Sequence, residues 1–197
     1  MSERADVKRQ LILDKAAEVF AAKGYRSVTM KDIVEASGIS RGGLYIYYDS
    51  TEEVFLDVIR SMDEAEEETN KSMTEHLKDA GSAELLLWFL KEQKREILKG
   101  KNSLSIAMYE YAFSCKQEGR NSGAKHRFET ATLVLQKILE RGNETGEFLC
   151  DDVKGMADDM MYAIEGMKVV ARTVGISEKK VDKELVYMMR QFMEVEE

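Results

Sequence analysis

Apolar residues recur three and four positions apart along most of the chain, which is the spacing of one face of an α-helix. The first such segment covers residues 4–23, and its periodic positions are Ile12, Ala16, Val19 and Phe20. Gly24 follows it, and glycine is the usual residue just beyond a helix C-terminus. We therefore expect the chain to open with a helix that ends at Lys23.

Two short helices are predicted next, because Thr29 with Asp32, and then Ser40, are typical helix N-caps. Between them, Gly38 can adopt the left-handed backbone that a tight turn needs. The second helix of this pair is expected over 41–48. The inward face of the first is expected to hold Ile33, Val34 and Ala36. This arrangement is a helix-turn-helix.

A long fourth helix is predicted to open at Ser50 and Glu53 and to continue into the charged segment 63–78, which we interpret as a solvated helix. Five further helices are predicted over 82–98, 102–118, 122–141, 151–174 and 177–197. The run 85–90 is apolar all round, so a buried strand could carry it, but helical flanks on both sides favour a bundle helix. The pattern thus predicts an all-α fold of about nine helices.

Composition supports this fold, because the chain contains no proline, where roughly ten would be ordinary for its length. Cys115 and Cys150 are too few for a disulfide framework, and we expect two reduced thiols. The first twenty residues carry charges throughout, unlike a signal peptide, and no stretch approaches the roughly 18 apolar residues of a membrane span. We expect a cytoplasmic protein with no membrane association.

Charge is distributed unevenly over the 197 residues, whose net charge is −8. Residues 1–48 hold eight Lys and Arg against six Asp and Glu, whereas the remainder holds 21 against 31. Only the first part is compatible with a polyanion such as DNA. The chain is therefore expected to divide into residues 1–50, which bind DNA, and residues 51–197, which do other work.

The helix predicted over 41–48 carries the chemistry that suits DNA. Leu44 and Tyr48 share its inward face, while Arg41, Gly42, Tyr45 and Ile46 are expected to project outward. An arginine can bond guanine or phosphate, tyrosine hydroxyls suit phosphate, and the helix N-terminus attracts anions. Two successive glycines cost about 1 kcal/mol each relative to alanine, which suggests a close approach of the backbone to a partner. The competing interpretation is a small helical hairpin whose aromatic residues only pack.

Other classes of protein fit less well. His76 and His126 lie far apart, neither pairs with a cysteine at metal-ligand spacing, and the chain has no Gly-rich phosphate loop. We therefore expect no enzyme activity, no metal site and no cofactor. The strongest alternative without DNA is a stand-alone helical protein that binds lipophilic molecules.

The pattern Thr-x-x-x-Ile, then Ala-Ser-Gly-Ile-Ser-Arg-Gly-x-Leu-Tyr-x-Tyr and Ser-x-Glu, resembles the TetR family of bacterial transcription factors over about residues 8–60. The resemblance implies that Thr29 and Tyr47 contact phosphate. It also implies contacts to bases or flanking backbone from Ser40, Arg41, Gly42 and Tyr45. The family usually has lysine at the position of Thr51, so we expect DNA affinity to depend more on Arg41, Lys31 and the basic N-terminal arm.

The last two predicted helices carry long, methionine-rich apolar faces. The resemblance implies that they form a four-helix interface with a second copy of the chain, so a homodimer could place two recognition helices about one DNA turn apart. Core packing within one chain is the alternative for any of these residues. The candidates for the dimer interface are Met156, Met160, Ile164, Met167, Leu185, Met188 and Phe192.

Several large side chains of residues 51–197 could line an effector pocket or could equally fill the core. These candidates are Trp88, Met108, Tyr109, Tyr111, Phe113, Phe128 and Tyr162. The resemblance implies a small-molecule effector, mainly apolar, and repression as the mode of regulation. The ligand would favour an arrangement of the fourth helix that releases operator DNA.

Overall fold

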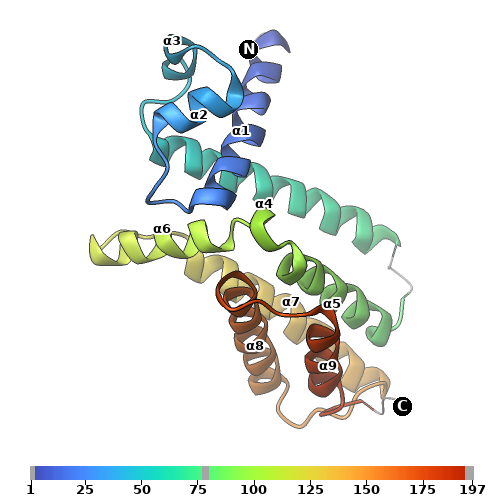
Figure 1. The fold of residues 1–197 in the computed structure, drawn as a ribbon. Helices are drawn as coiled ribbons and strands as arrows, with labels where there is room; N and C mark the ends of the chain where they lie inside the picture. The colour runs from blue at the N-terminus through green and yellow to red at the C-terminus, as the bar shows by residue number, and fades with distance from the viewer. Residues whose placement is uncertain (1–2, 77–79, 194–197) are drawn as a thin grey trace. The chain divides into compact units, whose positions relative to one another are not determined.

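The computed structural model describes residues 3–76 and 80–193, and over these residues it is all-helical, as predicted (Figure 1). One short 3₁₀-helix, η1 (Gly100–Asn102), joins α5 to α6. The α-helices are α1 (Glu3–Lys23), α2 (Met30–Ser37), α3 (Arg41–Tyr45), α4 (Thr51–His76), α5 (Ser82–Leu98), α6 (Ser105–Gln117), α7 (Ala124–Thr145), α8 (Val153–Thr173) and α9 (Glu178–Met189). Residues 85–90 lie inside α5, which excludes the strand alternative.

Helix ends differ from the prediction at three places. Helix α3 stops at Tyr45 rather than near Tyr48, because the chain turns where the Leu44 carbonyl accepts from the backbone N–H groups of Tyr47 and Tyr48. Helix α7 runs past Gly142 to Thr145 and ends where Gly146 takes a left-handed φ of 76°. Helix α9 ends at Met189, and the end of the predicted helix, residues 194–197, lies outside the described residues.

The chain forms two compact units, which we call unit 1 (residues 1–76 and 104–120) and unit 2 (77–103 and 121–197). This division by packing does not follow the boundary expected at residue 50. Helix α4 and, from much later in the sequence, α6 both pack against α1, in the same unit as α2 and α3. Unit 1 is therefore assembled from two separate stretches of the chain.

Unit 1 is built around α1, which packs against α2, α4 and α6. Its core includes four aromatic rings from different segments, Phe20, Tyr25, Phe55 and Tyr111. The centroid of the Phe55 ring lies 4.8 Å from that of Phe20 and 5.3 Å from that of Tyr111. Such edge-to-face and tilted pairs stabilise a core beyond their buried area. The Tyr111 hydroxyl also donates to Glu52 Oε1 at 3.1 Å, which joins α6 to the first turn of α4.

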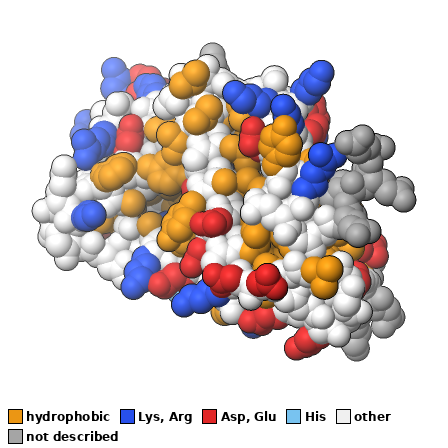
Figure 2. Space-filling model, turned by 90° about the horizontal axis from the view of Figure 1, so that it is seen from below, with side chains coloured by type: hydrophobic (Ala, Val, Ile, Leu, Met, Phe, Trp, Pro, Cys, Tyr) orange, Lys and Arg blue, Asp and Glu red, His pale blue; other side chains and the backbone are white. Residues whose placement is uncertain are grey.

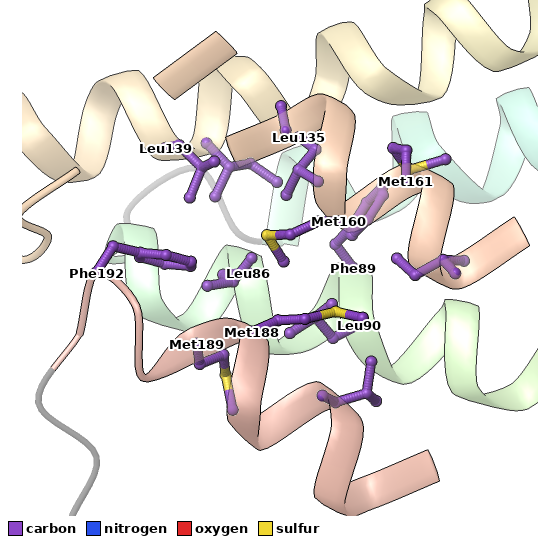
Figure 3. Close-up of a cluster of buried hydrophobic side chains, with 14 of the residues drawn as sticks. Leu86, Phe89, Leu90, Leu135, Leu139, Met160, Met161, Met188, Met189 and Phe192 are labelled. Carbon is purple, nitrogen blue, oxygen red and sulfur yellow. The ribbon is translucent and has the colours of Figure 1, made fainter. Parts of the chain in front are cut away.

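Unit 2 encloses a second core between α5, α7, α8 and α9. Figure 3 shows side chains from these helices converging, among them Leu86 and Phe89 of α5, Leu135 of α7 and Met160 of α8. A close approach of α7 to the segment after it depends on Gly142, because a Cβ at this position would lie 1.9 Å from Phe148 Cδ2. The Phe148 ring therefore occupies the space that any other residue would fill.

Within the described part of the chain, none of the helices is both long enough and apolar enough to cross a membrane. Both cysteines are buried and free, Cys115 in unit 1 and Cys150 in unit 2.

Candidate DNA-binding site

The site begins at the N-terminus of α2, where the predicted capping box is confirmed. The backbone N–H of Asp32 donates to Thr29 Oγ1 at 3.3 Å, and the backbone N–H of Thr29 donates to Asp32 Oδ2 at 2.8 Å. The Thr29 hydroxyl also donates to the same carboxylate at 2.8 Å. The hydrogen bond from Lys23, with those from Thr29, lowers the pKa of Asp32 to about 2. Asp32 thus stays ionised and accepts the hydrogen bond of the Thr29 hydroxyl. This hydroxyl can donate to a phosphate only if its hydrogen bond to Asp32 breaks.

The turn between α2 and α3 has the predicted geometry. Gly38 takes a left-handed φ of 67°, and its N–H donates to the Val34 carbonyl at 3.0 Å. Ser40 caps α3, because its hydroxyl accepts from the Gly43 N–H at 3.2 Å. One detail of α2 differs from the prediction: Ala36 is exposed, and Ser37 follows Ile33 on the inward face.

The inward and outward faces of α3 are as expected. Leu44 is fully buried, whereas Arg41, Gly42, Tyr45 and Ile46 are exposed. The guanidinium of Arg41 lies over the Tyr45 ring, 5.6 Å from its centroid, which is cation–π geometry. This contact holds two candidate DNA-binding groups together on the outer face before any partner arrives.

The two glycines of α3 have different surroundings. A Cβ at Gly43 would lie 2.9 Å from Ile39 Cγ2 and 3.1 Å from Ser40 Oγ, so the turn itself requires the missing side chain. A Cβ at Gly42 would meet nothing within 4 Å. Among the described residues, therefore, no neighbour requires glycine at position 42.

The other candidates surround this face unevenly. Lys31 is 83% exposed at its side chain and reaches Glu35 only at 3.6 Å, so its charge is available to a partner. Tyr47 and Thr51 are half-buried, Tyr47 after α3 and Thr51 as the first residue of α4. Ile46, which the sequence places on the outward face, is 81% exposed beside Tyr45.

The candidate pocket residues fall into both compact units. Met108, Tyr109, Tyr111 and Phe113 lie on α6 in unit 1, where Tyr111 is buried in the core and Phe113 is 65% exposed. The other three lie in unit 2, namely Trp88, Phe128 and Tyr162. Of these, the structure stacks the rings of Phe128 and Tyr162 with their centroids 5.4 Å apart, while Trp88 packs against the core of unit 2. A separate hollow of about 230 Å³ is lined by Gly146, Glu147, Leu149, Phe192 and Met193.

The candidate dimer residues lie in the core of their own chain. Met160 and Ile164 are at most 1% exposed, and the remaining buried members are Met167, Leu185, Met188 and Phe192. Met156 is partly buried against the same core. The large apolar residues exposed on α8 and α9 are others, namely Tyr162, Val169, Val170 and Tyr187, and Val174 is exposed directly after α8.

Comparison with known proteins matches both parts of the chain to models of one protein family. Residues 12–58 match the family model described as bacterial regulatory proteins, tetR family, and residues 85–182 match one described as tetracyclin repressor-like, C-terminal domain. The HTH-type transcriptional regulator YfiR of Bacillus subtilis (strain 168) is 34% identical over 148 residues, which cover 74% of this chain and 70% of that protein.

A more distant relative is QacR of Staphylococcus aureus, an HTH-type transcriptional regulator, which is 23% identical over 169 residues that cover 85% of this chain and 88% of that protein. Among solved structures, a transcriptional regulator from Saccharomonospora viridis in complex with choline superposes with a TM-score of 0.77. That match covers 96% of this chain and 100% of the other at 17% identity, and at this identity it shows the fold alone.

These matches extend over the helix-turn-helix and over most of the helical body. They favour a regulator over the stand-alone lipophile-binding protein, and the family consists of DNA-binding regulators rather than enzymes. The chain therefore belongs to the TetR family of bacterial regulatory proteins and is a helix-turn-helix, DNA-binding transcriptional regulator.

Proposed function

We propose that the protein is an operator-binding repressor that acts as a homodimer in the cytoplasm and is released from DNA by a small apolar effector. In this proposal residues 1–50 make the DNA contacts, and residues 51–197 carry dimerisation and effector binding. The observation that carries the proposal is the outward face of α3, where Arg41 and Tyr45 are held together beside an open glycine backbone. Arginine and tyrosine in this position suit the edges and phosphates of a major groove.

The apolar residues exposed to a second copy of the chain are not the dimer-interface candidates predicted from the sequence. Tyr162, Gly166 and Val170 of α8, and Val174 directly after its end, are exposed at four-residue intervals, so they form one stripe, which we call the α8 stripe. Figure 2 shows, for one face of the molecule, hydrophobic side chains exposed between charged ones. An exposed apolar stripe with a glycine in it supports close packing against a symmetry-related helix.

Substitution on the outer face of α3 tests operator binding. DNA fragments selected from the source genome supply the operator, and fluorescence anisotropy at a stated salt concentration measures its affinity. We expect Arg41→Ala and Tyr45→Ala each to weaken binding by about 1–3 kcal/mol, because each removes a contact to a base or a phosphate. Lys125→Ala is the control, since it removes one positive charge from an exposed site in unit 2. Equal effects of all three changes would refute the assignment of α3 as the recognition helix.

Substitution of the two glycines of α3 is expected to have opposite effects on stability. Gly42→Ala adds a methyl group where the protein has free space, so we expect unchanged or slightly higher stability, by up to about 1 kcal/mol, together with weaker operator binding. Gly43→Ala is expected to lower stability, because its methyl group meets Ile39 and Ser40. Thermal unfolding and anisotropy measure both properties. Undiminished operator affinity in Gly42→Ala would show that DNA does not approach this backbone.

A charge in the α8 stripe tests the dimer. Wild-type protein at micromolar concentration is expected to have the mass of two chains by light scattering. We expect Val170→Glu to yield the mass of one chain, because an unpaired carboxylate would be buried in the interface. The matched control is Val7→Glu, which places the same charge at a 68% exposed position on α1 and should leave the mass unchanged. A monomeric wild-type mass would rule out the proposed dimer.

Effector binding is tested by a thermal-shift screen of apolar compounds. A compound that raises the melting temperature binds the folded protein, and we expect it to reduce operator affinity 5- to 150-fold, the usual range of coupling between two sites. The physical reason is that the ligand favours an arrangement of α4 in which the two recognition helices no longer match the groove spacing. Stabilising compounds that all leave operator affinity unchanged would contradict this mechanism.

A further inference from the structure

We propose that Asp57 is a positioning residue for DNA recognition, because its buried carboxylate holds Tyr48 and thereby fixes where the recognition helix ends. The inference rests on the proposed operator binding by α3. Asp57 lies on α4 and is not among the predicted DNA contacts. Its role would be to act through Tyr48 and the neighbouring Tyr47, without touching DNA itself.

The segment that needs positioning is the connection between α3 and α4, residues 46–50. Within it Tyr48 is the one buried residue, with 6% of its surface exposed. The Tyr48 hydroxyl donates to Asp57 Oδ2 at 2.5 Å. Tyr47 is the adjacent residue in the chain, and its ring centroid lies 6.4 Å from that of Tyr48. A displacement of Tyr48 would therefore move both Tyr47 and the end of α3.

Asp57 itself is fixed from two further directions. Arg9 of α1 donates from Nη2 to both carboxylate oxygens at 2.7 Å, and from Nε to Oδ2 at 3.0 Å. Arg60, one turn along α4, donates to Oδ1 at 3.0 Å. The Asp57 side chain is 8% exposed, and a carboxylate at this depth is tolerated only when it is paired and hydrogen-bonded. The group thus joins α1, α4 and the connection from α3 at one point.

The ionisation of this group suits the role. Burial alone would raise the pKa of Asp57, but the hydrogen bonds from Tyr48 and Arg9 and the charge of Arg9 outweigh it, so the pKa lies below its ordinary value. Burial and the hydrogen bond to Asp57 raise the pKa of Tyr48. At neutral pH the carboxylate therefore accepts and the phenol donates, which gives one defined geometry.

A purely structural role would have different consequences. If the hydrogen bond only added stability, its loss would lower the melting temperature and leave the DNA affinity of folded protein unchanged. If it positions the recognition segment, its loss should weaken binding to operator more than binding to random DNA. Non-specific affinity depends mainly on the charge of the protein, whereas specific affinity requires the register of α3 on the bases.

The experiment replaces Tyr48 with phenylalanine, which keeps the ring and removes the hydroxyl. We expect Tyr48→Phe to lower operator affinity about tenfold and affinity for random DNA less than about twofold, since a hydrogen bond to a charged group is lost. Stoichiometric titration at high concentration gives the active fraction, so unfolded protein is not counted as weak binding. The control is Val58→Ala, which removes core contacts from the next residue of α4 and should lower the melting temperature without changing the ratio of operator to random affinity.

A double-mutant cycle of Tyr47 and Tyr48 adds a measurement of operator affinity that a purely structural role of Asp57 would not affect. If Asp57 acts through Tyr47, then Tyr47→Phe should weaken operator binding less in the Tyr48→Phe protein than in the wild type. Unchanged operator affinity in Tyr48→Phe, an equal fall of the affinity ratio in Val58→Ala, or additive effects in the cycle would each overturn the inference. Wild-type protein that does not distinguish operator from random DNA would instead overturn the proposed function on which the inference rests.

Discussion

The recognition helix is too short to hold itself in place, and the rest of unit 1 compensates for this. Helix α3 has five residues, well below the length at which a helix is stable in water without tertiary packing. Its position depends on the Ser40 cap at one end, the burial of Leu44 in the middle and the burial of Tyr48 just beyond the other end. Because these three inward contacts hold α3 in place, the side chains of its outward face are not needed for the stability of the fold.

Much of the site was predictable because its signals are local. A cap needs a hydroxyl and an N–H three residues later, and a tight turn needs a residue that tolerates positive φ, so Thr29, Gly38 and Ser40 could be identified from spacing alone. The inward position of Leu44 followed from helical periodicity in the same way. The length of α3 did not, because the turn at Tyr47 and Tyr48 depends on where Tyr48 is anchored, and the anchor lies on α4.

What could not be predicted depends on pairing across long stretches of chain. The sum of charges over residues 1–48 includes Arg9, yet the structure neutralises Arg9 with Asp57 from the acidic part. The signal for Asp57 was present, as a carboxylate between Val54 and Val58 on an apolar face, but its partners were not. For α8, hydrophobicity marks two faces, and only packing shows that Met160 and Ile164 face their own chain while Val170 faces outward.

Helix α6 has a consequence for how regulators of this kind can be recombined. It belongs to unit 1, where Tyr111 completes the aromatic core and bonds Glu52, although it follows α5 of the other unit in sequence. The matched N-terminal family segment ends at residue 58, before α6. A chimera joined at that boundary would divide α4 and would combine α1, α2 and α3 with a foreign α6. The two units instead divide after residue 76, before residue 104 and after residue 120, so an exchangeable DNA-binding module must include residues 104–120 from the middle of the protein.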